Sequence, residues 1–111
     1  MYTEIIIAVK DYMAGKTPIP VARAMREVAS NLDLARRQQR ITVDLLAERA
    51  NVSAPTVRAL LNEGKGSFEN FLRIARLLGM LDSVVEGTDP LNTPEGRLRA
   101  DEDTPQRVRS R

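Results

Sequence analysis

Hydroxyl, guanidinium and amide groups gather between residues 42 and 62 of this 111-residue chain, at a spacing suited to molecular recognition. Such groups hydrogen-bond a polar or phosphate-bearing partner. The chain has no cysteine and no histidine, which removes disulfides, thiolate zinc sites and the commonest general base. The carboxylates of Asp101, Glu102 and Asp103 cluster, but their surroundings would not position them. We therefore expect neither an enzyme nor a bound cofactor.

The segment Ile41–Asn62 has the pattern of two short helices joined by a tight turn. Thr42 is placed to cap the first helix, whose inward face would consist of Leu46, Ala47 and Ala50. Asn51 would take the turn, because asparagine tolerates a left-handed backbone. Val52 would then fill the space between the two helices.

The second helix of this segment has one apolar and one polar side. Ser53 would cap it, and Pro55 lies in its first turn, where proline is tolerated. The buried face would hold Val57, Leu60 and Leu61, and the outer face Ala54, Thr56, Arg58, Ala59 and Asn62. A rigid helix pair with a small, polar and basic outer face is typical of a helix-turn-helix, whose second helix enters the major groove of DNA.

Two further helices are predicted before this pair. Residues 2–14 carry apolar residues at helical spacing, namely Tyr2, Ile5, Ile6, Val9 and Met13. We favour a helix over the alternative of a strand, which is suggested by β-branching and by the alternation of Ile5, Ile7 and Val9. Residues 15–20 (GKTPIP) would form a turn. Residues 21–40 would form the next helix, with an apolar side made of Ala22, Met25, Val28, Ala29, Leu32 and Ala35.

After the pair, Gly64–Lys65–Gly66 would form a loop, and Ser67 would cap a helix that stops at Gly79. The buried face of that helix would consist of Phe68, Phe71, Leu72, Ala75 and Leu78. Met80–Val85 would add another apolar turn or two. From residue 87 onward prolines and charges replace core-forming residues, so we expect a mobile tail, with a short helix carrying Leu98 that Thr93 can cap.

These elements predict an all-α fold, a compact five-helix repressor-like bundle with an extra N-terminal helix and an irregular C-terminal tail. The predicted organisation is an N-terminal helix and turn over residues 1–20, a DNA-binding domain over residues 21–86 and a mobile tail over residues 87–111.

The basic residues are mostly arginine. The net charge is +2, and 14 of the 17 basic residues are arginine. Arginine forms forked hydrogen bonds with phosphates and base edges better than lysine does, although a GC-rich genome would also enrich it. No apolar run approaches the roughly 20 residues needed to span a membrane, and Ile5–Val9 is too short for a signal peptide. We expect a cytoplasmic protein without membrane contact.

Residues 28–81 resemble the Xre family of phage-repressor-like DNA-binding proteins. The most specific portion is LLAERANVSAPTV (residues 45–57), and LRIARLLG (residues 72–79) supports it independently. Within that family, LGMLDSVV followed by the tail RLRADEDTPQRVRSR is most similar to HipB-type antitoxins. The resemblance implies a DNA-binding homodimer that represses its own operon, with a kinase-fold toxin as a partner.

The chain departs from the family pattern at several positions. Val43 stands where a glutamine often touches DNA, and Ala54 and Pro55 stand where long polar side chains are common. Leu61 replaces a glutamate, which would leave its usual partner, Arg36, free to bind phosphate. Direct base reading would therefore fall on few side chains.

Arg58 is the first candidate for a base contact, because a bidentate Arg–guanine pair discriminates by about 1–3 kcal/mol; a phosphate contact or a solvated position is the alternative. Thr56 would touch a thymine methyl or a phosphate, and Ala59 a thymine methyl. Lys65 would lie near the DNA backbone. The remaining candidate DNA contacts are Thr42 and Ser53, which are caps first, and Ala54, Pro55, Asn62, Arg36 and Arg40.

The tail ends in Arg107, Arg109 and Arg111, which would enter a minor groove or simply solubilise the chain. The dimer surface has two candidates, the N-terminal helix with Ile5, Ile6 and Val9, and the segment with Met80, Leu81, Val84 and Val85.

Two functions follow from these patterns. The first is a dimeric, sequence-specific transcriptional repressor of a toxin–antitoxin operon, or a stand-alone phage or prophage regulator. The second is a protein-interaction module whose main role is to bind and neutralise a toxin, because a mixed-charge tail can fold onto a partner.

Overall fold

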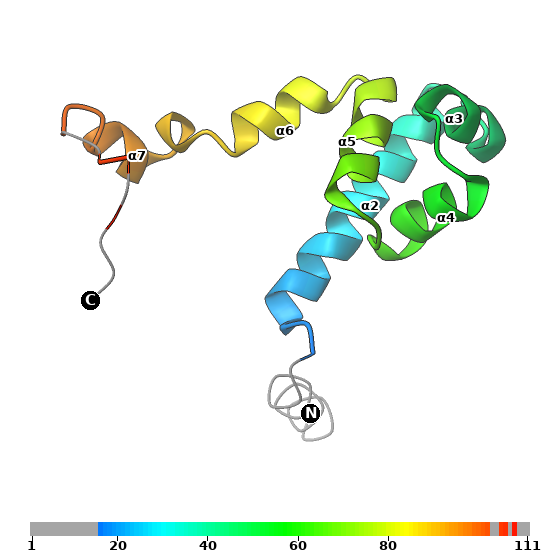
Figure 1. Ribbon diagram of the computed structural model, residues 1–111, viewed down its shortest axis with the longest axis horizontal. Helices are drawn as coiled ribbons and strands as arrows, with labels where there is room; N and C mark the ends of the chain where they lie inside the picture. The colour runs from blue at the N-terminus through cyan, green and yellow to red at the C-terminus, as the bar shows by residue number, and fades with distance from the viewer. Residues whose placement is uncertain (1–15, 103–104, 107, 109–111) are drawn as a thin grey trace. The chain divides into compact units, whose positions relative to one another are not determined.

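The computed structural model describes residues 16–102, 105, 106 and 108. Their regular structure is entirely helical, without a strand, as the sequence predicted, and Figure 1 shows the order of the helices. The helix predicted over residues 2–14 lies outside the described residues. By its contacts the chain divides into two compact units, Met1–Gly79 and Met80–Arg111.

Helix α2 (Ile19–Gln38) begins two residues earlier than the sequence predicted. Pro18 stands at the N-cap and Pro20 in the first turn. Proline is tolerated at these positions because the N–H groups of the first turn have no carbonyl partner within the helix. The helix ends where Arg40 takes a positive φ of 58°, and the N–H of Ile41 then donates to the Arg36 carbonyl at 3.1 Å. This bond pattern closes the helix and turns the chain toward the next element.

Helices α3 (Val43–Ala50) and α4 (Ala54–Glu63) follow with the predicted caps and the predicted buried faces. Helix α5 (Phe68–Leu77) begins after Ser67, whose Oγ accepts from the N–H of Asn70 at 3.0 Å, and ends before Gly79. In the first unit α2 packs on α4, α3 packs on α4 and α5, and α4 also contacts α5.

The core of the first unit includes one large side chain from each of the four helices described between residues 16 and 79. Leu32, Leu46, Val57 and Ile74 are each less than 2% exposed. Burial of such a side chain stabilises the fold by about 1.5–3 kcal/mol. This cluster therefore holds the four helices together and fixes the position of α4 among them.

The buried face of α5 differs from the prediction. Phe68 is 72% exposed, whereas Ile74, which the predicted face omits, is fully buried. Phe68 is the first residue of the helix, and a side chain there leans back over the chain that precedes it. The core packs against Ile74 and Ala75 in the C-terminal half of α5 and against Leu78, the residue that follows the helix.

The second unit contains α6 (Leu81–Gly87), the 3-10 turn η1 (Pro90–Asn92) and α7 (Pro94–Leu98). None of these three elements has a buried residue. The Thr93 cap predicted for a short helix is confirmed, because its Oγ1 accepts from the N–H of Gly96 at 3.0 Å. Arg97 ties α7 to η1 by donating to the Leu91 carbonyl at 2.8 Å. The segment predicted as irregular therefore has local helical structure.

Candidate nucleic-acid interface

The connection between α3 and α4 is a left-handed turn at Asn51, with φ 57° and ψ 47°. The N–H of Val52 donates to the Ala47 carbonyl at 3.0 Å, and the N–H of Asn51 donates to the Glu48 carbonyl at 3.3 Å. Arg73 of α5 reaches the turn from outside, since its Nη1 donates to the Asn51 carbonyl at 3.4 Å. The turn thus has the conformation that the sequence predicted, and it fixes how α4 is presented relative to α3.

The helix starts are capped by the two predicted hydroxyls. Thr42 Oγ1 accepts from the N–H of Leu45 at 3.1 Å, and Ser53 Oγ accepts from the N–H of Thr56 at 3.2 Å. The Ser53 and Thr56 hydroxyls also lie 2.7 Å apart, in hydrogen-bonding contact. The caps leave the N–H groups of Val43 and Asp44 at the start of α3, but only that of Ala54 at the start of α4, because Pro55 has no N–H. An anion is favoured at such helix starts.

The outer face of α4 carries two exposed polar side chains, Arg58 and Asn62, one turn apart. Pro55 is also exposed. The small residues of the same face, Ala54, Thr56 and Ala59, are half-buried. A partner can therefore approach the backbone of α4 closely, with Arg58 and Asn62 as the long donors on that face.

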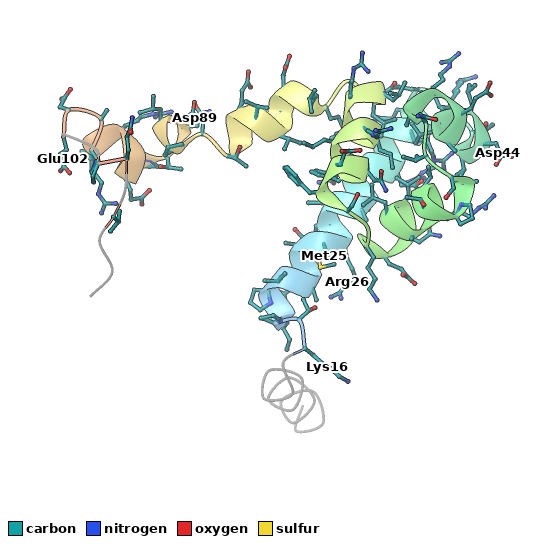
Figure 2. The ribbon with its side chains drawn as sticks, in the orientation of Figure 1. Lys16, Met25, Arg26, Asp44, Asp89 and Glu102 are labelled. Atoms are coloured by element: carbon teal, nitrogen blue, oxygen red, sulfur yellow. The ribbon has the colours of Figure 1, made fainter. Side chains whose placement is uncertain are left out.

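Arg58 is paired with a carboxylate that the sequence analysis did not single out. Its Nη2 lies 3.7 Å from Oδ1 of Asp44, in the first turn of α3, and the two side chains are 54% and 84% exposed. Figure 2 labels Asp44 on this helix. A carboxylate beside the main cation of the face lowers the local positive charge and holds the guanidinium from one side. The sequence feature that could have indicated this pair is Asp44 itself, an acidic residue in the first turn of α3.

Arg36 is not free for phosphate, contrary to expectation. Its Nε and Nη2 bind Oδ1 of Asp33 at 3.0 and 2.9 Å, and its Nη1 donates to the Ile41 carbonyl at 2.9 Å. The side chain is 18% exposed. Asp33, one turn earlier on α2, is its carboxylate partner. Arg40, by contrast, is exposed, at the positive-φ position that ends α2.

A polar cleft of about 590 Å³ adjoins the far end of α4. Asn62 and Lys65, both predicted to contact DNA, line it together with two basic residues that the sequence analysis missed, Lys16 and Arg26. Figure 2 shows Arg26 in the N-terminal half of α2 and Lys16 in the segment that precedes this helix. No local sequence pattern joins these residues, because the cleft exists only where α2 packs on α4.

Among residues 16–102, 105, 106 and 108 no three histidine, cysteine, aspartate or glutamate side chains gather in a group able to hold a metal ion. No helix within those ranges has both the length and the apolar content needed to cross a membrane. In comparisons with known proteins, no family model, no curated protein and no solved structure matched this chain.

Proposed function

We propose that the protein is a sequence-specific DNA-binding repressor and that α3 and α4 form its helix-turn-helix. The observation that carries the proposal is the outer face of α4, where half-buried small residues surround the exposed guanidinium of Arg58. Small residues let a recognition helix enter the major groove, and arginine is the commonest reader of guanine there. The left-handed turn at Asn51 supports the proposal because it fixes the angle at which α4 is presented.

Phosphate contacts in this proposal come from the two helix starts and from the loop after α4. The capped N-termini at Thr42 and Ser53 offer N–H groups to phosphate oxygens. Lys65 follows α4 in an exposed loop and adds a positive charge. Such contacts set the register of α4 on the duplex without reading sequence.

One copy of α4 reads few base pairs, so we propose that two copies bind together as a homodimer. Half-sites for such a dimer lie about 34 Å apart, one turn of DNA, on the same face of the duplex. The resemblance to HipB-type antitoxins supports an operator upstream of the protein's own reading frame. It is also the basis for proposing a kinase-fold toxin as the product of the neighbouring gene.

The test is a binding titration of the full chain with labelled DNA from upstream of its own reading frame. A shuffled duplex of identical composition is the control for sequence preference. We expect the upstream DNA to bind at least about a thousandfold more tightly, the lower end for specific over non-specific binding. Equal affinity for both duplexes would contradict sequence-specific repression.

A second candidate, a protein-interaction module that neutralises a toxin, is favoured by an apolar groove on the first unit. The groove has a volume of about 410 Å³, and Val21, Val28 and Phe68 line it with side chains that are 49%, 43% and 72% exposed. Exposed apolar side chains gathered at one groove are typical of a protein-binding surface. Phe68→Ser should weaken binding of the neighbouring gene's product and leave DNA binding unchanged; loss of both would point to a folding defect.

A further inference from the structure

The polar cleft beside α4 carries more positive than negative side chains, and most of them lie outside the outer face of α4. Lys16, Arg26 and Lys65 contribute three positive charges, and Glu63 contributes the one carboxylate. Lys16 comes from the segment before α2, Arg26 from the N-terminal half of α2, and Glu63 and Lys65 from the end of α4 and the loop that follows it. Three cations around one concave surface attract a polyanion more strongly than the net charge of +2 for the whole chain suggests.

The two sides of the cleft are held together by a close approach of backbone to backbone. Gly64 has a φ of 69°, and a Cβ atom placed on it would come within 2.8 Å of the carbonyl carbon of Met25. Only a residue without a side chain fits there. This contact fixes Lys65, the next residue, relative to Arg26, which follows Met25 on α2.

The cleft also continues the outer face of α4. Asn62 is exposed on that face, one turn after Arg58, and it lines the cleft as well. A duplex lying against Arg58 and Asn62 would therefore meet the cleft next. At the edge of a base-reading helix, the part of DNA available for contact is the sugar–phosphate backbone.

We propose that this cleft binds the DNA backbone that flanks the base pairs read by α4, with Lys16, Arg26 and Lys65 as its phosphate contacts. The inference rests on the proposed function and extends it, because it brings the N-terminal half of α2 and the segment before it into the DNA footprint. Lysine and arginine at such positions neutralise phosphates and release counterions, so each contact appears in the salt dependence of binding.

The first test removes charge from the cleft and measures the salt slope. In the double variant Lys16→Gln with Arg26→Gln, the slope of log K against log salt should fall by roughly 1.8, since each phosphate contact contributes about 0.9. The preference for operator over shuffled DNA should stay as in the wild type. Arg76→Gln is the control, because Arg76 is exposed on α5 and does not line the cleft.

The second test adds a carboxylate. Ala22 lines the cleft, whereas Ala24 lies two residues further on the same helix and lines the apolar groove instead. Ala22→Glu should weaken binding of all duplex DNA about tenfold at low salt, since a carboxylate would face phosphates at short range. Ala24→Glu, with the same added charge, should change affinity less than about twofold at that ionic strength. Circular dichroism on both variants confirms that α2 is intact.

The outcomes separate this inference from the proposed function. If the wild type binds its operator and the cleft variants keep the wild-type slope and affinity, the cleft is not part of the footprint, while the repressor proposal stands. If the wild type binds no duplex DNA at any salt concentration, both proposals are wrong.

Discussion

Asp44 of α3 lies 3.7 Å from Arg58 of α4, carboxylate oxygen to guanidinium nitrogen, on the face proposed to meet DNA. The pair joins the first turn of one helix to the middle of the next. A carboxylate there opposes phosphate while it restrains the side chain proposed to read bases. Removal of the Asp44 carboxylate would then raise the affinity for DNA and lower the selectivity for the operator.

Asp44→Asn should raise affinity for all duplex DNA about threefold at low salt, because one negative charge leaves the interface. The preference for operator over shuffled DNA should fall, since Arg58 is then less restrained. Both side chains are more than half exposed, so the free energy of unfolding should change by less than about 1 kcal/mol. Fluorescence anisotropy with both duplexes measures the first two effects; a fall in overall affinity would contradict the proposed repulsion.

Arg58→Ala should reduce discrimination between operator and shuffled DNA by roughly 10- to 100-fold, the effect of losing one bidentate contact with guanine. Arg58→Lys is the matched variant, because it keeps the charge but lacks the planar fork. It should retain overall affinity while losing most of the discrimination. Competition titrations measure the ratio. If Arg58→Ala keeps the wild-type discrimination, Arg58 contacts phosphate and not a base.

Gly64 and Gly79 offer a paired test of the close approach between the loop after α4 and α2. Both have positive φ, 69° and 75°, but a Cβ at Gly79 would meet nothing within 4 Å. Gly79→Ala should cost about 1 kcal/mol from backbone conformation alone. Gly64→Ala should cost roughly 2 kcal/mol more, because the backbone of Met25 has to move. Urea denaturation gives both values, and equal losses would mean that the contact is loose.

Ser53 has two roles that one pair of variants can separate. Ser53→Ala should lower the free energy of unfolding by about 1 kcal/mol through loss of the cap on α4. Ser53→Asp keeps a capping oxygen and a favourable charge at the helix start, so stability should remain near that of the wild type. Its negative charge should nevertheless weaken DNA binding at least about tenfold. Tight binding by Ser53→Asp would place this helix start away from phosphate.

The helix pair was predictable in detail from the sequence because its determinants are local. Thr42, Asn51 and Ser53 each act on backbone groups within four residues of themselves. The buried residues Val57, Leu60 and Leu61 follow from helical spacing alone. Caps, turns and periodicity of this kind do not depend on the rest of the fold.

Two of the wrong or missing predictions depend on distant packing, whereas a third overlooked a local ion pair. Phe68 continues the apolar stripe of α5, but no core covers its end of the helix, so it is exposed. Arg36 was expected to be free because Leu61 replaces the glutamate that the resemblance implies, yet Asp33, three residues earlier on the same helix, binds it. The cleft joins Arg26 to Lys65 across 38 intervening residues, and only the packing of α2 on α4 brings them together.

Residues with a positive φ recur at the C-terminal ends of the helices. Within residues 16–79, a residue of this kind ends or follows each of the four helices, namely Arg40, Asn51, Gly64 and Gly79. An L-residue at such a position is disfavoured by about 1–2 kcal/mol, whereas the mirror-image residue is favoured. In a chemically synthesised chain, D-alanine at position 79 should therefore make the protein more resistant to heat, and a D-residue at position 40 should relieve the strain that L-arginine bears there.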